Sequence, residues 1–103
     1  MTPEGRVKAQ LKKLLSEHGA YYHMPVQNGM GAPSLDFICC HRGCYFGIET
    51  KAGNKKPTPR QENTMNQIRL AGGLAFLINE VEGLDELREW LTRKSDESFP
   101  VVL

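Results

Sequence analysis

The sequence predicts an α/β fold in which a central mixed sheet is flanked by helices. Helix-like and strand-like segments follow one another in the order α-β-β-β-α-β-α. Two of the strands are joined by a link short enough for a tight hairpin. The chain of 103 residues has the length of one compact domain, so we expect a single domain over residues 1–103.

An apolar stripe at helical spacing predicts the first helix, over residues 3–18. The members of this stripe are Val7, Leu11, Leu14 and Leu15. Pro3 suits the first helical turn and Gly19 suits the position after the helix end. When the stripe is extended back by one turn it reaches Glu4, which we therefore expect on the core-facing side.

Residues 20–26 are rich in aromatic side chains and are predicted as the first strand. Residues 35–40 (LDFICC) and 44–50 (CYFGIET) are predicted as the next two strands. Their spacing places a tight turn at Arg42 and Gly43.

This turn fixes which residues of the hairpin oppose one another. Because His41 then faces Cys44, Asp36 is expected to stand opposite Glu49 on the same face of the sheet. Lys51 lies two residues beyond Glu49 and shares that face. The same face is expected to carry Ser34, Ile38, Cys40, Tyr45 and Gly47. The opposite face is expected to carry Leu35, Phe37, Cys39, Phe46 and Ile48.

The second helix is predicted over residues 59–71 by a clear start signal. Thr58 is the expected cap, Pro59 occupies the first position, and Gln61 at the third position completes a capping box. Glycines at positions 72–73 end the helix.

The remaining elements follow the second helix. Residues 74–80 (LAFLINE) form a continuous apolar segment, which predicts a strand buried on both faces. Residues 84–94 are predicted as a third helix, and residues 98–103 as a short strand or a docking tail. In the third helix Leu84, Leu87 and Leu91 are expected to point inward, with Trp90 at the edge of the stripe.

The overall charge and the cysteines narrow the possible functions. The net charge is +1, so binding to nucleic acid would depend on local basic patches. The sequence contains no apolar run of membrane-spanning length and no signal-like N-terminal segment. Three cysteines, two of them adjacent, argue against a disulfide framework. We therefore expect a cytoplasmic location and no membrane partner.

The acids of the hairpin indicate a metal site. Two carboxylates that face each other across a strand pair repel, and a hard divalent cation such as Mg²⁺ removes this repulsion. Lys51 on the same face could hold or help to deprotonate a water. Glu4 and Gln61 both begin helix stripes that point inward.

The segment that follows Glu49 carries a cluster of basic residues without acids, and phosphate is the natural ligand of such a cluster. The cluster consists of Lys51, Lys55, Lys56 and Arg60. An acid pair with a lysine beside a phosphate-attracting loop indicates hydrolysis of phosphodiesters.

These residues resemble the PD-(D/E)XK nuclease superfamily and, within it, the VRR-NUC (virus-type replication-repair nuclease) family. The matching pieces, over roughly residues 4 to 73, are Glu4, GAPSLD ending in Asp36, IETK, and KPTPRQ ending in Gln61. The resemblance implies a restriction-endonuclease-like αβββαβ core and a DNA endonuclease that depends on Mg²⁺ or Mn²⁺. It also implies a homodimer that acts like a Holliday junction resolvase on branched DNA, of phage or prophage origin.

The resemblance also implies a role for each site residue. Asp36, Glu49 and the backbone carbonyl of Thr50 bind metal, and Lys51 positions the attacking water. Glu4 completes the site, directly or through water, and Gln61 supports it. DNA contacts are expected from Lys55, Lys56 and Arg60. The sequence departs from many relatives in two places: Pro33 is separated from Asp36, and Thr50 is polar where an aliphatic residue is common. If Thr50 faces the opposite side of the strand from Glu49, it must find a polar partner or lie at the strand edge.

Other interpretations stay open at this point. Glu4 could simply complement the helix dipole, and Gln61 could be only a capping residue. The domain could bind DNA without cutting it. The motif CCHRGC could bind zinc through Cys39, Cys40, His41 and Cys44, but strand alternation sends Cys39 and His41 to one face and Cys40 to the other.

Overall fold

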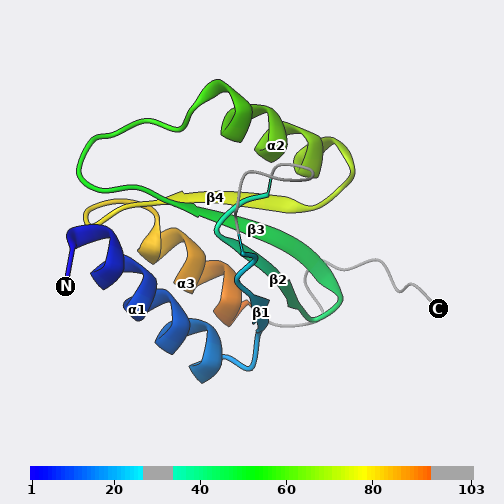
Figure 1. Ribbon diagram of the computed structural model, residues 1–103. Helices are drawn as coiled ribbons and strands as arrows, with labels where there is room; N and C mark the ends of the chain where they lie inside the picture. Colours follow the sequence, from blue (N-terminus) through cyan, green and yellow to red (C-terminus); the bar gives the residue numbers. More distant parts are fainter. Residues whose placement is uncertain (27–33, 94–103) are drawn as a thin grey trace.

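The computed structural model describes residues 1–26 and 34–93, which form a four-stranded sheet between helices (Figure 1). The strands are β1 (Tyr21–His23), β2 (Phe37–His41), β3 (Cys44–Thr50) and β4 (Leu74–Ile78), and they lie in the order β1-β2-β3-β4. The first three strands pair antiparallel and β4 pairs parallel to β3. The helices are α1 (Pro3–Glu17), α2 (Pro59–Leu70) and α3 (Leu84–Thr92). The predicted mixed sheet and the order of its elements are confirmed.

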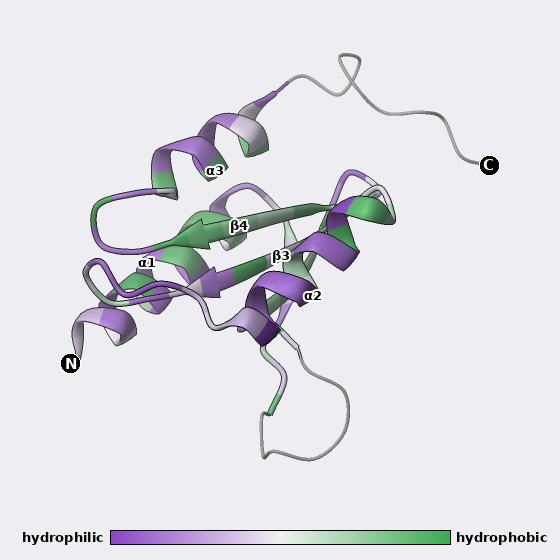
Figure 2. Ribbon diagram, turned by 90° about the horizontal axis from the view of Figure 1, so that it is seen from above, coloured by the Kyte–Doolittle hydropathy of each residue, from purple (hydrophilic) through white to green (hydrophobic). Residues whose placement is uncertain are grey.

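The main core lies between the sheet and the two helices α1 and α3, while α2 covers the other face (Figure 1). All four residues of the predicted α1 stripe are buried. From α3 the core receives Leu87, Trp90 and Leu91. The rings of Trp90 and Phe46 lie 4.8 Å apart between centroids, so Trp90 is part of the core and not only its edge. Figure 2 shows the apolar strands enclosed by helices whose outer surfaces are hydrophilic.

The β2–β3 hairpin turns where the sequence predicts. Arg42 and Gly43 both have positive φ angles, 51° and 79°, as a two-residue turn of type I′ requires. The predicted register holds from the Phe37–Ile48 pair to the His41–Cys44 pair.

The tip of the hairpin closes the C-terminal end of α3. The guanidinium of Arg42 donates to the carbonyls of Trp90 and Arg93. The His41 Nε2 lies 3.2 Å from the carbonyl oxygen of Leu91 and donates to it. These donors satisfy carbonyls that a helix end leaves without partners.

The start of α2 forms the predicted capping box. The backbone N–H of Gln61 donates to Thr58 Oγ1 at 3.2 Å, and the backbone N–H of Thr58 donates to Gln61 Oε1 at 2.9 Å. The helix begins at Pro59, as expected. This box fixes the direction of the Gln61 side chain before any tertiary contact forms.

Three predictions about the strands need correction or lie outside the described residues. The first strand is shorter than predicted, covering only Tyr21–His23. β4 is not buried on both faces, because Phe76 and Ile78 are buried whereas Leu77 points the other way and is 37% exposed at a groove beside α2. The predicted element at residues 98–103 lies outside the described residues. Among the described residues, no helix has the length and apolar character needed to cross a membrane.

Candidate active site

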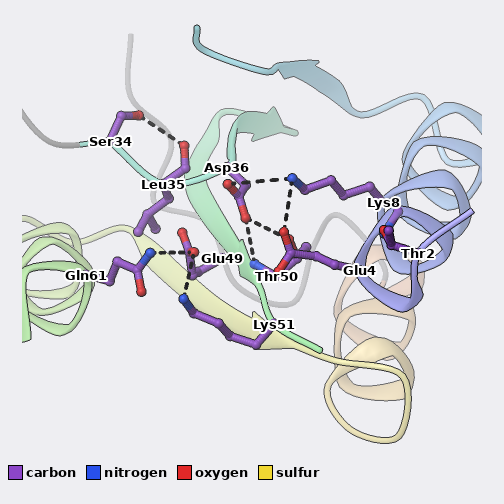
Figure 3. A network of polar contacts seen from close by, with 11 residues as sticks. Thr2, Glu4, Lys8, Ser34, Leu35, Asp36, Glu49, Thr50, Lys51 and Gln61 are labelled. Atoms are coloured by element: carbon purple, nitrogen blue, oxygen red, sulfur yellow. Dashed lines mark hydrogen bonds and ion pairs between the residues drawn. The ribbon is translucent and has the colours of Figure 1, made fainter. Parts of the chain in front are cut away.

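Polar side chains from five segments meet at the C-terminal end of β3 (Figure 3). β3 turns from apolar to hydrophilic at this end (Figure 2). The residues that meet here are Glu4 and Lys8 of α1, Asp36 before β2, Glu49 and Thr50 of β3, Lys51 after it, and Gln61 of α2.

Asp36 is held by Thr50. Its Oδ2 accepts the backbone N–H of Thr50 at 3.0 Å and the hydroxyl of Thr50 at 2.7 Å. The polar residue of the IETK motif therefore has the partner that its position requires. Both hydrogen bonds are charge-assisted, so they fix the carboxylate firmly.

Asp36 does not form the expected strand pair with Glu49. The β2–β3 ladder ends at Phe37 and Ile48, one pair short of it, and the chain bends at Asp36. The two acids are still close enough that the charge of Asp36 raises the pKa of Glu49. They are therefore neighbours, although they are not a regular cross-strand pair.

Leu35 explains why the alternation breaks here. It was expected on the face of Phe37, but it lies on the α2 face over Gly47. A Cβ atom at position 47 would lie 2.8 Å from Leu35 Cδ1 and 3.1 Å from Ile68 Cδ1. Because Gly47 has no side chain, Leu35 fills the space between β3 and α2. Asp36 is then turned toward Thr50.

Glu49 is a nearly buried acid, 3% exposed. Its Oε2 accepts the Gln61 Nε2–H at 2.8 Å and lies 3.8 Å from the Lys51 ammonium. Its Oε1 is buried and has no hydrogen-bond partner within the described part of the chain. Burial, and then the charge of Asp36, raise the pKa of Glu49 to about 7, although the charge of Lys51 and a hydrogen bond from the Asp36 backbone lower it.

Gln61 has both of the roles that its position suggested. Its Oε1 accepts the Thr58 N–H in the capping box, and its Nε2 donates to Glu49. A single amide thus joins the start of α2 to the acid of β3. The cap orients the amide so that its donor points at the carboxylate.

One solved structure identifies the kind of domain that this chain forms. No protein-family model and no curated protein match the sequence. A solved structure described as a VRR_NUC domain is similar to this chain with a TM-score of 0.73 and 26% sequence identity. The similarity covers 86% of this chain and 97% of that chain. This chain is therefore similar to a VRR-NUC domain in both sequence and fold. The expected restriction-endonuclease-like α/β fold is confirmed as well.

Lys8 is a member of this site that the sequence pattern did not indicate. Its Nζ lies 3.4 Å from Glu4 Oε2 and 4.0 Å from Asp36 Oδ1. The i,i+4 spacing from Glu4 is a signal that could have predicted the first contact. The second contact depends on how α1 packs against the sheet, which the helix pattern does not reveal.

Glu4 lies at the edge of this site, with a side chain that is 40% exposed. It pairs with Lys8, and its charge makes a small contribution to the raised pKa of Glu49. Within the described residues, no group of three or more His, Cys, Asp or Glu side chains is arranged to hold a metal ion. The residues that suit a hard cation are therefore Asp36 and Glu49, and the partnerless Glu49 Oε1 is an oxygen that such an ion would satisfy.

The basic residues that were expected to contact DNA are exposed. Lys55 and Lys56 lie on the loop between β3 and α2, and Arg60 lies in the first turn of α2. Lys55 and Lys56 also line an open groove between this loop, α2 and β4. This surface is accessible to an extended polyanion.

The cysteines of the CCHRGC motif alternate as predicted. Cys39 and His41 are buried, whereas Cys40 is exposed. Burial raises the pKa of the Cys39 thiol to about 12. Because Cys39 and His41 lie on one face of the strand and Cys40 on the other, these side chains do not converge on one point.

Proposed function

We propose that this VRR-NUC domain is a metal-dependent DNA endonuclease that hydrolyses phosphodiester bonds. The family match supports nuclease activity in general. The observation that supports metal dependence is the pair of neighbouring carboxylates. Glu49 is nearly buried, its Oε1 lacks a hydrogen-bond partner among the described residues, and the charge of Asp36 raises its pKa.

In this proposal Asp36 and Glu49 hold Mg²⁺ or Mn²⁺, with the Thr50 backbone carbonyl as a further ligand. Glu4 completes the site, directly or through a water. Thr50 already occupies Asp36 Oδ2, so Asp36 offers the cation Oδ1. A bound divalent ion supplies Lewis-acid stabilisation of the charge that develops on the phosphate.

The chain's own residues orient the reacting groups. Lys51 is 17% exposed in its side chain and lies beside Glu49, where its ammonium can hydrogen-bond and position the attacking water. Gln61 holds Glu49 in a fixed direction through Oε2. As the water oxygen bonds to phosphorus, the bond from phosphorus to one bridging oxygen breaks. The attacking water gives a proton to solvent, and the departing sugar oxygen takes a proton from solvent.

The substrate in this proposal is branched or otherwise structured DNA, cut by a homodimer. Lys55, Lys56 and Arg60 are exposed and contact the phosphates that flank the cleaved bond. Two copies of one active site suit paired cuts in a four-way junction. Paired cutting of four-way junctions suits a phage or prophage protein that acts in the cytoplasm of a host cell.

Cleavage assays test the catalytic proposal. The purified protein is incubated with single-stranded, duplex, flap and four-way-junction DNA in Mg²⁺, Mn²⁺ or EDTA. We expect cleavage only with a metal ion and strongest on branched DNA. Asp36→Ala should abolish cleavage, and Lys51→Ala should slow it at least about 100-fold, while both variants still bind DNA. Lys13→Ala, at an exposed position on α1, is the matched control.

Two results would contradict this proposal. Unchanged cleavage by Asp36→Ala or Lys51→Ala would show that the acid–lysine site is not the active site. Binding of all four substrates without cleavage in either metal would favour a non-cleaving DNA-binding module. Light scattering tests the dimer separately, and a monomer at micromolar concentration would contradict it.

A further inference from the structure

Lys8 reaches the acid cluster from the opposite side to Lys51 (Figure 3). Its ammonium lies between Glu4 Oε2, at 3.4 Å, and Asp36 Oδ1, at 4.0 Å. Its side chain is 28% exposed, so this contact is partly shielded from solvent. The proposed reaction uses Lys51 and leaves Lys8 without a role.

The two oxygens of Asp36 have different surroundings. Oδ2 accepts two hydrogen bonds from Thr50, one from its N–H and one from its hydroxyl. Oδ1 is therefore the oxygen on which a further cation can bind. In this structure Oδ1 faces the ammonium of Lys8.

We propose that Lys8 is an internal counter-ion that a divalent cation displaces from Asp36 Oδ1, and that Lys8 thereby sets the metal affinity of the site. This inference rests on the proposed function. In the absence of a divalent ion, Lys8 and Lys51 partly neutralise the acids Glu4, Asp36 and Glu49. When a cation binds Asp36, the Lys8 ammonium leaves on its flexible stem without disturbing α1. Lys8 is thus a positioning residue, because it acts through Asp36.

The expected effect follows from the strength of such a contact. A partly exposed ion pair changes an equilibrium constant by about two- to fivefold. A variant without the ammonium no longer has to break this pair, and it removes a positive charge next to the incoming cation. Lys8→Met should therefore bind divalent cations about two- to fivefold more tightly than the wild type. This direction is opposite to that expected if Lys8 simply held Asp36 in a metal-binding position.

Calorimetric titration with Mn²⁺ in the absence of DNA tests this inference at pH 8, where Glu49 is ionised. Lys8→Met should bind more tightly, and Lys8→Arg, which keeps the charge, should bind like the wild type. Lys12→Met is the matched control, since Lys12 is exposed one turn further along the same helix. Asp36→Asn should weaken binding in all backgrounds.

The outcomes separate this inference from the proposed function. If the wild type binds Mn²⁺ and Lys8→Met binds it equally or more weakly, the role of Lys8 is wrong and the metal site stands. If Lys8→Met and Lys12→Met tighten Mn²⁺ binding equally, the effect comes from the lower overall positive charge, and the proposed role of Lys8 at Asp36 is wrong. If the wild type binds no Mn²⁺, the proposed metal dependence fails and the inference fails with it.

Discussion

Replacing Glu49 with glutamine should stabilise the protein at alkaline pH, because it removes a charge that the fold buries. The folded state raises the pKa of Glu49 from its ordinary value of 4.5 to about 7. At 1.36 kcal/mol for each pH unit, this difference corresponds to about 3 kcal/mol. Burial is the largest cause, and repulsion from Asp36 is the second. The cost is not screened by solvent, since Glu49 is 3% exposed.

The direction of the pH dependence follows from the raised pKa. Below about pH 4.5 Glu49 is protonated in both the folded and the unfolded state. Between pH 4.5 and about 7 the folded state binds more protons than the unfolded state, so stability falls as the pH rises. Above about pH 7 the full cost is present. The Glu49→Gln variant should not lose stability in this way as the pH rises, and it should not cleave DNA.

Urea unfolding of both proteins in EDTA, at a series of pH values from 4.5 to 8.5, measures the effect. The free energy of unfolding of the wild type relative to Glu49→Gln should fall by about 3 kcal/mol across this range. Glu62→Gln, at an exposed position in the first turn of α2, is the control and should follow the wild type. A wild-type curve parallel to that of Glu49→Gln would refute the reasoning, because it would show that Glu49 is no harder to ionise in the folded state.

Two further predictions separate the roles of the remaining site residues. Gln61→Glu keeps the acceptor for Thr58 but loses the donor to Glu49, so α2 should stay capped while the pKa of Glu49 rises further and cleavage falls. Gln61→Ala loses both bonds and should destabilise the protein by about 1 kcal/mol through the cap, and a thermal stability equal to that of the wild type would contradict the capping role. Thr50→Val removes the hydroxyl that donates to Asp36 and should destabilise the protein by about 1–3 kcal/mol in urea unfolding. Thr50→Ser should retain most of this stability, and a similar loss in both variants would indicate a packing effect.

Much of the fold could be predicted because its signals are local. The turn at Arg42 and Gly43 set the register of the whole β2–β3 ladder, since each pair follows from the previous one. The capping box at Thr58 and the apolar stripe of α1 depend on residues within one or a few helical turns. These features need no knowledge of how the elements pack.

The sequence predicted most of the residues that form the candidate site, but it predicted fewer of the contacts between them. Strand alternation would place Asp36 opposite Glu49, but alternation applies only while the strands remain paired, and the ladder ends before Asp36. The missing side chain at Gly47 lets Leu35 pack against α2, and this packing breaks the alternation. The pattern of side chains along β2 does not reveal the space that Gly47 leaves on β3.

The sequence by itself determined which residues could form an acid–lysine site, because the residue types and their spacing are properties of the chain. Only the tertiary structure decided their partners: Thr50 for Asp36, Gln61 for Glu49, and Lys8 between Glu4 and Asp36. The contacts of Thr50 and Lys8 with Asp36, and of Gln61 with Glu49, join residues at least twelve positions apart. Their lengths are set by how α1 and α2 rest on the end of β3, and this packing depends on the whole core.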